Sequence, residues 1–214
     1  MKMADQAAET ERVRRVYEKE APRYDRQMRC FDRALFADGR EWVCARAEGD
    51  VLEVAVGTGR NLGHYSEGVR LTGIEFSPAM LDIARARAAR LGVAVDLRVG
   101  DAQALDFPDA SFDTVVCTLA LCTIPDDRAA VAEMKRVLRP GGRLLLLEHV
   151  RSPVAAVRLV QRVLDPLAVR FEADHLLREP LEHLQAEGME IETLLRSKLG
   201  FVEQVAARKP SPPA

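Results

Sequence analysis

From residue 50 onward, short apolar runs alternate with longer stretches in which apolar residues recur at helical spacing. Short apolar runs indicate strands buried in a sheet, and the longer stretches indicate amphipathic helices. The alternation predicts βαβ units and therefore a mostly parallel α/β sheet with helices on both faces. The strands are expected at residues 51–56, 70–75, 94–99, 112–117 and 143–149, and the helices between them at 60–65, 78–91 and 127–138.

Cap and turn residues define some of these boundaries. Ser77 followed by Pro78 is typical of a helix start, because serine caps free N–H groups and proline fits the first helical turn. Residues 139–142, Arg-Pro-Gly-Gly, end a helix and turn the chain into the next strand. The unbroken apolar run 144–147 in that strand suits burial on both faces.

The two ends of the chain differ from this alternating middle. The first ~20 residues have the spacing of an amphipathic helix that ends before Pro22. Residues 24–47 are expected to form helical cover over a site or a sheet edge. A helix at 179–187 precedes two strands at 190–195 and 201–207, which should form an antiparallel hairpin that completes the sheet.

These elements predict one α/β domain at residues 51–209, with residues 1–50 as a helical cover over the site. Residues 152–188 are expected to be a helical lid or insert within the domain. The proline-rich residues 210–214 are expected to be disordered.

Residues 152–171 permit two interpretations. Apolar side chains follow one side of this segment, arginines lie among the rest, and Pro166 is expected to interrupt it. Such a pattern fits a basic amphipathic helix that rests on a lipid surface. It also fits a lid whose apolar side packs over an acceptor pocket, and we favour the lid. An apolar lid predicts a small, hydrophobic acceptor.

Composition narrows the class of protein. A chain of 214 residues with 48% hydrophobic residues can bury a substantial core. Its 31 basic and 33 acidic residues leave a net charge of -2, so we expect no nucleic-acid partner. No apolar run approaches the roughly 20 residues of a membrane span. The first 20 residues also lack the apolar region of a signal peptide.

The cysteines suggest neither a metal site nor disulfides. They are Cys30, Cys44, Cys117 and Cys122. They form no CxxC pair and no ligand spacing with the histidines, so we expect no zinc site and no disulfide framework. Reduced thiols fit a cytoplasmic protein. No sequence pattern bears on the oligomeric state.

The candidate chemistry begins at the turn after the first predicted strand. Residues 53–61 read EVAVGTGRN, in which the glycines let the backbone approach a ligand and the N–H groups that follow are free to bind it. A dinucleotide fingerprint would have a third glycine where Leu62 stands, so a pyrophosphate cradle is disfavoured.

Acidic residues lie at the ends of three successive predicted strands. Glu75 follows the first glycine by roughly 20 residues, where an acid binds both hydroxyls of a ribose. Glu53 supplies a carboxylate for the cationic end of a ligand, and Asp101 is placed to accept from an adenine amino group. These carboxylates would repel a phosphate cofactor. Together they predict a cationic adenosyl ligand, S-adenosylmethionine.

With these residues, the chain resembles the class I S-adenosylmethionine-dependent methyltransferases over residues 51–149, and more weakly to residue 209. The runs VVCTLALC, RVLRPGG, EHV and VLDP, which begin at Val115, Arg136, Glu148 and Val163, are similar to those of the methyltransferase-like alkyl thiol methyltransferases and their bacterial relatives. Ubiquinone, menaquinone and phospholipid N-methyltransferases share this core. The resemblance implies a Rossmann-like sheet of seven strands that ends in an antiparallel hairpin.

The resemblance also implies the residues that bind the cofactor. It places Glu53, Ala55, Gly57, Thr58, Gly59 and Asn61 around the methionine part, Glu75 and Phe76 at the ribose, Asp101 and Ala102 at the adenine, Thr118 and Leu119 near the sulfonium, Tyr24 over the cofactor, and Met80 among the remaining contacts. Ala55 stands where many of these enzymes have glycine. The animal thiol enzymes begin with a membrane anchor that the first 20 residues do not contain, so we do not expect membrane residence.

Methyl transfer is an in-line displacement, to which a protein contributes alignment, desolvation and, where needed, a base. A thiol ionises near pH 8.5 and is helped by the sulfonium, so it needs no strong base. His149 is the candidate to orient the acceptor or take its proton; the alternative is a structural, hydrogen-bonded histidine. Cys122 and His175 are further candidates for the substrate pocket, and Cys117 is expected in the core.

Several functions therefore remain open at this point. S-methylation of a small thiol is favoured, and N-methylation of phosphatidylethanolamine or C- or O-methylation of a quinol or phenol is the alternative. A nicotinamide-dependent oxidoreductase would share the sheet and the ribose acid, although Leu62 disfavours it. A non-catalytic S-adenosylmethionine-binding protein would share the whole cofactor site.

Overall fold

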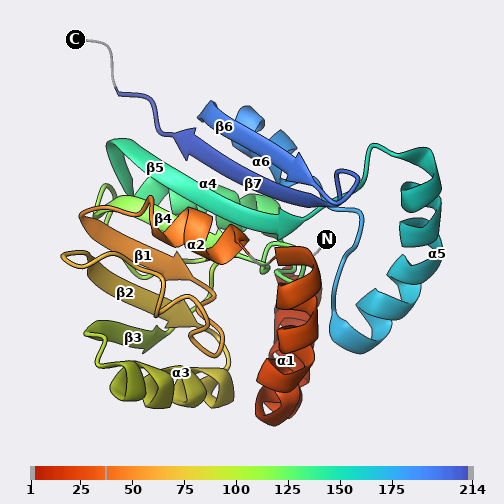
Figure 1. Cartoon of the computed structure of the whole chain (residues 1–214), viewed down its shortest axis with the longest axis horizontal. Coiled ribbons are helices and arrows are strands. Elements are labelled where there is room, and N and C mark those ends of the chain that lie inside the picture. Colours follow the sequence, from red (N-terminus) through yellow and green to blue (C-terminus); the bar gives the residue numbers. More distant parts are fainter. Residues whose placement is uncertain (1–2, 37, 212–214) are drawn as a thin grey trace.

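The computed structural model describes residues 3–36 and 38–211. Its centre is a seven-stranded sheet of order β3-β2-β1-β4-β5-β7-β6 (Figure 1). The strands are β1 (Asp50–Val54), β2 (Arg70–Glu75), β3 (Val95–Val99), β4 (Phe112–Thr118), β5 (Leu138–His149), β6 (Glu190–Ser197) and β7 (Val202–Arg208). The β5–β7 and β7–β6 pairs are antiparallel and the other pairs are parallel. This confirms the predicted Rossmann-like sheet with its closing hairpin.

Helices cover both faces of the sheet (Figure 1). They are α1 (Met3–Phe31), the π-helix η1 (Asp32–Phe36), α2 (Gly39–Cys44), α3 (Pro78–Leu91), α4 (Asp127–Val137), α5 (Ala155–Glu172) and α6 (Pro180–Ala186). One apolar core joins the sheet to α2 and α3, and a second joins it to α4 and α6. The two cores hold the sheet rigidly between the helical layers, so the strand ends form a fixed edge.

The central strand β5 packs against both cores. Leu144 and Leu146 belong to the core beneath α4, whereas Leu145 and Leu147 belong to the core beneath α2. Side chains alternate between the faces of a strand, so an unbroken apolar run fills both sides. All four leucines are buried, which confirms the interpretation of the run 144–147.

The helix predicted at residues 60–65 is wrong. The chain from Gly57 to His64 forms successive three-residue turns, in which Gly59 N donates to Val56 O and Leu62 N donates to Gly59 O. Gly59 has a left-handed φ of 77°, which a right-handed helix does not accommodate. The turns instead deliver side chains of this segment to the end of β1.

The prediction that the first helix ends before Pro22 is also wrong, because α1 continues to Phe31. A proline within a helix removes one backbone hydrogen bond. Tertiary contacts compensate on both sides of it. Before Pro22, Tyr17 packs against Phe76 with ring centroids 6.2 Å apart, and after it Thr58 Oγ1 donates to Asp25 Oδ1 at 2.7 Å.

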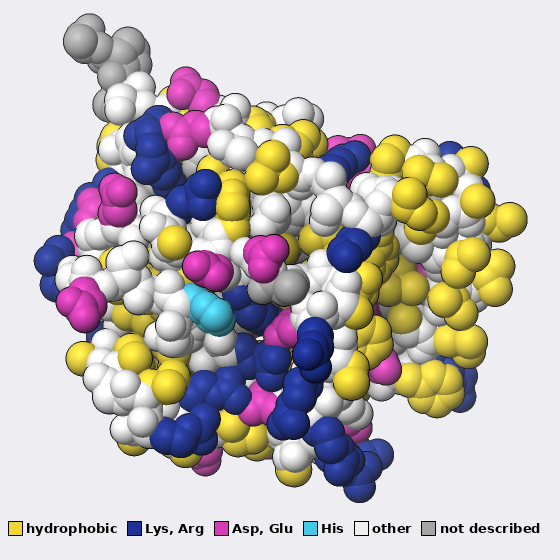
Figure 2. Space-filling model, viewed as in Figure 1, with side chains coloured by type: hydrophobic (Ala, Val, Ile, Leu, Met, Phe, Trp, Pro, Cys, Tyr) yellow, Lys and Arg dark blue, Asp and Glu magenta, His cyan; other side chains and the backbone are white. Residues whose placement is uncertain are grey.

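The structure also corrects two expectations about residues 152–171. Helix α5 runs through Pro166 without interruption and forms the outermost helix in Figure 1. Large apolar side chains along α5 and at its N-cap are 40–67% exposed: Val154, Leu159, Val160, Val163, Leu164, Leu167 and Phe171. They form the yellow surface at the right of Figure 2. The apolar side of α5 therefore does not pack over a pocket. The loop after α5 does reach the strand ends, since His175 N donates to Cys122 O at 2.9 Å.

The C-terminal prediction is only partly covered by the structure. Residues 209–211 follow β7 without helix or strand, and Lys209 Nζ donates to Leu138 O at 2.6 Å. Residues 212–214, on which most of the prediction of disorder falls, lie outside the described residues.

The leucines of β5 are buried whereas the apolar side chains of α5 are exposed, and this difference in burial gives a stability test. Leu145 is completely buried, so Leu145→Ala should lower the free energy of unfolding by about 2–5 kcal/mol through the cavity that it leaves. Leu159 is 63% exposed, and Leu159→Ala should change that free energy by less than about 0.5 kcal/mol. Denaturant unfolding followed by circular dichroism measures both. A loss of several kcal/mol in Leu159→Ala would show that another surface covers α5 in solution.

Candidate active site

Two adjoining hollows lie at the carboxyl ends of the parallel strands, where ligands bind in sheets of this kind. The first has a cavity volume of about 50 Å³ and opens to solvent. Among the predicted residues it is lined by Tyr24, Ala55, Gly57, Thr58, Glu75, Phe76, Met80, Thr118 and Leu119. The second has a cavity volume of about 40 Å³ and is lined in part by Asp101 and Ala102. Both hollows share Ala55, Phe76 and Thr123, so they form one elongated site.

The glycine turn between β1 and β2 has an unusual backbone. Ala55, Gly57 and Gly59 have φ values of 56°, 56° and 77°, all in the left-handed region. An alanine with such a φ carries backbone strain of about 1 kcal/mol, whereas a glycine does not. This difference agrees with the glycine expected at position 55 from the resemblance to class I methyltransferases. Gly59 does not line the hollow. A Cβ atom there would lie 2.7 Å from Leu62 Cδ1 and 3.2 Å from Ala84 Cα, so Gly59 permits the turn to pack on α3.

Glu75, at the end of β2, holds the glycine turn in place. Its Oε2 accepts from Gly57 N and its Oε1 accepts from Ser77 N, both at 2.9 Å. The side chain is buried, and burial raises the pKa of Glu75 to about 7 although these N–H groups favour the carboxylate. The carboxylate also lines the first hollow, where its remaining lone pairs are available to hydroxyl donors.

Glu53, at the end of β1, lies behind the hollow rather than in its wall. Its two carboxylate oxygens accept from Asn61 Nδ2 and from the Tyr65 hydroxyl, each at 2.9 Å. Burial raises the pKa of Glu53 to about 7, against the effect of both hydrogen bonds. Asn61 is equally buried and in turn accepts from Arg40 Nη1 at 2.9 Å. Glu53 and Asn61, both predicted as site residues, thus position Arg40, which was not predicted.

Arg40 is a site residue that sequence reasoning missed. It comes from α2, lines the first hollow and is only 8% exposed. Its guanidinium donates to Asn61 and Thr118 and forms an ion pair with Asp32 at 3.2 Å. No motif surrounds Arg40, because its place depends on the packing of α2 against the sheet.

Tyr17 also lines the hollow and was missed, although its spacing gave a clue. Tyr17 and Tyr24 are two helical turns apart on α1, so they share one face of the helix. Tyr17 packs against Phe76 with ring centroids 6.2 Å apart. Burial raises the pKa of Tyr24 to about 12, so its phenol stays neutral.

Asp25 attaches α1 to the glycine turn. Besides accepting from Thr58 Oγ1, its carboxylate forms ion pairs with Arg60 and Arg87. These contacts outweigh burial and hold the pKa of Asp25 below its usual value. These ion pairs hold α1 against the glycine turn, and α1 stands beside the strand ends in Figure 1.

The second hollow is organised by Gln103, another residue that the sequence did not reveal. Asp101 Oδ1 accepts from the backbone N–H of Gln103 at 2.9 Å and from Nε2 of the same residue at 3.0 Å. Gln103 also donates to Thr10 of α1 and accepts from Asp126 N, which precedes α4. The Asp101 side chain is thereby fixed at the wall of the hollow.

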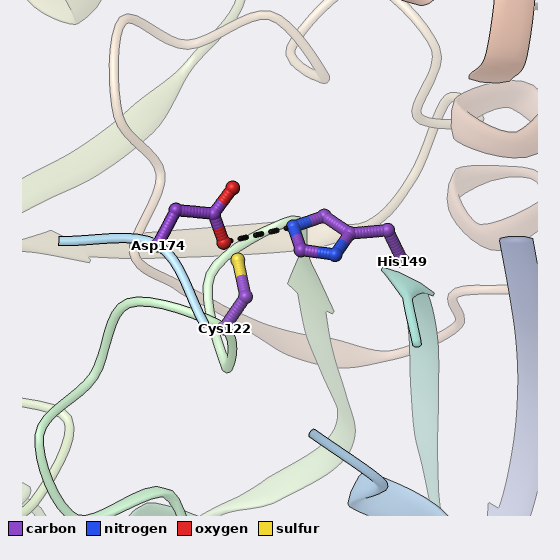
Figure 3. Close-up of side chains that lie close together, drawn as sticks. All are labelled: Cys122, His149 and Asp174. Atoms are coloured by element: carbon purple, nitrogen blue, oxygen red, sulfur yellow. Dashed lines mark ion pairs between the residues drawn. The ribbon is translucent and has the colours of Figure 1, made fainter. Parts of the chain in front are cut away.

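At the ends of β4 and β5, the structure brings Cys122 and His149 together with Asp174 (Figure 3). His149 Nε2 lies 3.0 Å from Asp174 Oδ1, and its ring stacks on Phe201 with centroids 5.4 Å apart. Burial alone would lower the pKa of His149, but Asp174 and Glu148 raise it above its usual value. The three side chains lie beside the first hollow rather than in its wall.

The other candidates at this edge have different positions. The backbone N–H of His175 donates to Cys122 O, as described above. The imidazole of His175 is half-buried, and burial and the charge of Arg178 lower its pKa. Cys117 is fully buried in the core beneath α4, in agreement with the prediction. Asp174 was missed because it belongs to a loop with no motif of its own.

Comparison with known proteins shows the family of this chain. The methyltransferase domain family matches residues 52–146. The chain is 45% identical over 114 residues to phosphatidylethanolamine N-methyltransferase of Cereibacter sphaeroides, covering 51% of this chain and 56% of that protein. It is 37% identical over 153 residues to demethylmenaquinone methyltransferase of Thermus thermophilus, and the match covers 67% of this chain and 68% of that protein. It is 33% identical over 169 residues to thiol S-methyltransferase TMT1A of Homo sapiens, covering 76% and 68%.

The chain belongs to the S-adenosylmethionine-dependent methyltransferases. The cofactor of this methyltransferase is S-adenosylmethionine, as the acidic strand ends predicted. A possible histamine N-methyltransferase from Thermotoga maritima has the same fold, with a TM-score of 0.70 at 22% identity over 92% of this chain and 99% of that one. The chain spans little more than half the length of the Cereibacter sphaeroides relative. In the described part of the methyltransferase, no helix has the length and apolar character needed to cross a membrane.

The buried glutamates give the ligand-free methyltransferase a defined pH dependence. The pKa of Glu53 is about 7 in the folded state against 4.5 for the free side chain, so its protonated form stabilises the fold. That stabilisation is complete below pH 4.5 and is lost as the pH rises through about 7. The free energy of unfolding should therefore fall between about pH 5 and about pH 8, and the Glu53 share should be about 1–3 kcal/mol.

Glu53→Gln should flatten this dependence, because an amide does not titrate. Glu192→Gln is the matched control, since Arg208 and Arg143 hold the pKa of Glu192 below its usual value despite partial burial, and it stays ionised over this range. Denaturant unfolding at several pH values measures the slopes. Equal slopes in wild type and Glu53→Gln would contradict the assignment.

Proposed function

We propose that this methyltransferase transfers the methyl group of S-adenosylmethionine to a small, hydrophobic thiol in the cytoplasm. The observation that carries the proposal is the elongated hollow. Asp101 lines one part of this hollow, and Glu75 and the buried guanidinium of Arg40 line the other part. Such a site complements a ligand with an adenosyl group at one end and an amino-acid carboxylate at the other.

The adenosyl part of the cofactor is assigned to the second hollow and to Glu75. Asp101 accepts the adenine amino group there, beside Ala102. The two ribose hydroxyls donate to Glu75, whose backbone contacts already hold the carboxylate in one orientation. A preformed acceptor of this kind binds without the entropic cost of ordering its own side chain.

The methionine part is assigned to the first hollow. Gly57 and Thr58 leave room for its backbone-like atoms, and the guanidinium of Arg40 binds its carboxylate. Glu53 acts indirectly, because it orients Asn61 and thereby Arg40. The sulfonium then lies near Thr118 and Leu119 at the end of β4, which line the same hollow.

The acceptor is assigned to the side of the hollow next to Cys122 and His149. An acceptor thiolate there attacks the methyl carbon in line with the sulfonium bond, which breaks and leaves its electron pair on sulfur. The cationic donor becomes neutral S-adenosylhomocysteine. His149 orients the acceptor in this proposal. The likeness to thiol S-methyltransferase TMT1A over 76% of the chain supports a thiol.

An acceptor panel tests this function. The protein is incubated with S-adenosylmethionine and small thiols, phenols, quinols or phosphatidylethanolamine, and mass spectrometry records the gain of one methyl group and the formation of S-adenosylhomocysteine. We expect the apolar thiols to be methylated fastest. Tight cofactor binding without any methylated product would indicate a non-catalytic protein, and calorimetric binding of NADH alone would exclude the proposed cofactor site.

Glu75→Ala should weaken S-adenosylmethionine binding by about 1–3 kcal/mol, because two hydroxyl groups lose a charged acceptor. Isothermal titration calorimetry measures the dissociation constant, and Glu67→Ala, at an exposed glutamate of the preceding loop, is the control. Since Glu75 also holds Gly57, circular dichroism must show that the variant is folded. Unchanged affinity in folded Glu75→Ala would place the ribose elsewhere.

Methylation of phosphatidylethanolamine is a second candidate, which the exposed apolar side of α5 favours. Seven large apolar side chains there are accompanied by Arg158, Arg162 and Arg170, a composition that suits an anionic bilayer. The relative from Cereibacter sphaeroides bears this activity in its name. The apolar surface is visible over α5 in Figure 2.

This candidate predicts that Val163→Glu reduces methylation of phosphatidylethanolamine in anionic liposomes at least severalfold. The charge would have to enter the apolar boundary of the bilayer, whereas a soluble thiol should be methylated at the same rate. Leu91→Glu, at an exposed leucine of α3, is the control for an added charge outside α5. Equal lipid methylation by wild type and Val163→Glu would exclude α5 as the lipid contact.

A further inference from the structure

Cys122, His149 and Asp174 converge from three separate segments (Figure 3). Cys122 lies in the turn after β4, His149 ends β5, and Asp174 belongs to the loop after α5. A sulfur, a nitrogen and an oxygen from these side chains all lie within 4.8 Å of one another. Because the three residues are far apart in the sequence, spacing arguments alone did not predict a metal site here.

The polar atoms around this cluster are poorly satisfied. In the described ranges 3–36 and 38–211, three buried side-chain atoms lack a hydrogen-bond partner: Glu148 Oε2, His149 Nδ1 and Asp174 Oδ1. All three lie in or next to the cluster. Buried polar groups are paired in the great majority of cases, so such a concentration calls for an explanation. The contact between His149 Nε2 and Asp174 Oδ1 at 3.0 Å is an ion pair when the imidazole is protonated.

The charges of the cluster favour a cation. A thiol and two carboxyl groups, from Cys122, Asp174 and Glu148, surround one imidazole in a buried region. A divalent cation would stabilise the thiolate and the Asp174 carboxylate together.

We propose that Cys122, His149 and Asp174 bind one zinc ion, whose fourth position takes the thiolate of the methyl acceptor. Mixed sulfur, nitrogen and oxygen donors are typical of zinc, and three protein ligands with one open position are typical of its catalytic sites. The binding of zinc is independent of the proposed function. The binding of an acceptor thiolate rests on the proposed function.

The cluster is close to the hollow assigned to the methyl donor. Ala120 and Thr123, which flank Cys122 in the chain, both line that hollow. Tyr17 lines it as well, and the nearby Cys122 and Asp174 add to the burial that raises the pKa of its phenol. The Asp174 side chain is 21% exposed, whereas Cys122 and His149 are buried.

The chemistry balances without a further reactant. An acceptor thiol that binds the metal loses its proton to solvent, because a coordinating thiol is deprotonated. Its sulfur then forms the bond to the methyl carbon while the carbon–sulfonium bond breaks. The products are a neutral thioether, which is a weaker ligand than a thiolate and leaves the metal, and S-adenosylhomocysteine. His149 acts here as a ligand and not as a base.

Metal content provides the first test. The full chain, purified without chelators, should contain about one zinc per molecule by plasma mass spectrometry. Cys122→Ser and Asp174→Asn should each retain less than about a tenth of that amount. Cys44→Ser, at a buried cysteine outside the cluster, and His64→Gln, at an exposed histidine, are the matched controls and should keep the metal.

Cobalt provides a test that does not depend on the folding of the variants. Zinc-free wild-type protein titrated with Co²⁺ should develop thiolate-to-cobalt absorption in the near ultraviolet, together with the visible bands of tetrahedral cobalt. A small apolar thiol added without S-adenosylmethionine should then shift the visible bands. If the wild-type protein neither contains zinc nor develops the thiolate absorption, the metal site is overturned.

The outcomes separate this inference from the proposed function. Zinc-free protein that methylates thiols as fast as the zinc-loaded protein would overturn the role of the metal and leave thiol methylation intact. Zinc-loaded protein that methylates no thiol would overturn the proposed acceptor and leave the metal site intact. We expect methylation of thiols to fall at least tenfold on removal of zinc and to return when zinc is restored.

Discussion

The contact between the Glu75 carboxylate and the backbone N–H of Gly57 is the constraint on which the site depends. It fixes a turn of left-handed residues against the neighbouring strand before any ligand binds. Glu53 and Glu148 act in the same way at the ends of β1 and β5, since each is buried and accepts hydrogen bonds from an adjoining loop. Burial raises the pKa of all three to about 7. At this edge of the sheet, three buried carboxyl groups therefore hold the adjoining loops. Their burial costs free energy, and in return they preorganise the site.

Helix α1 joins the two sides of this edge. Asp25 binds the glycine turn, Thr10 accepts from Gln103 beside the second hollow, and Arg12 donates to Val169 O in α5. Tyr17 is close both to the donor hollow and to Cys122 and Asp174. The contacts of α1 lie on both sides of Pro22, since Thr10 and Arg12 precede this residue and Asp25 follows it.

Local sequence predicted those parts of the fold that local physics determines. The bounds of α3 agree because Ser77 caps Met80 N and Pro78 opens the first turn, and β2 agrees because its apolar run is bounded by polar residues. The helix expected at 60–65 does not form because Asn61 and Tyr65 bind Glu53 instead, a tertiary preference that no periodicity reveals. For the same reason Arg40, Gln103 and Asp174 were missed: their positions depend on packing between distant segments. Tyr17 alone could have been found, from its helical spacing to Tyr24.

The extent of the family match explains why the methyl donor is easier to identify than the methyl acceptor. The methyltransferase domain family matches residues 52–146, which include the glycine turn, Glu75 and Asp101. His149, Asp174 and α5 all follow that range. Relatives named for lipid, quinone and thiol acceptors can therefore share the donor side while differing beyond it. The chemistry of the acceptor must then be sought where the later segments meet the strand ends. There His149 and Asp174 join Cys122 of the matched range, and the apolar helix α5 lies outside the sheet.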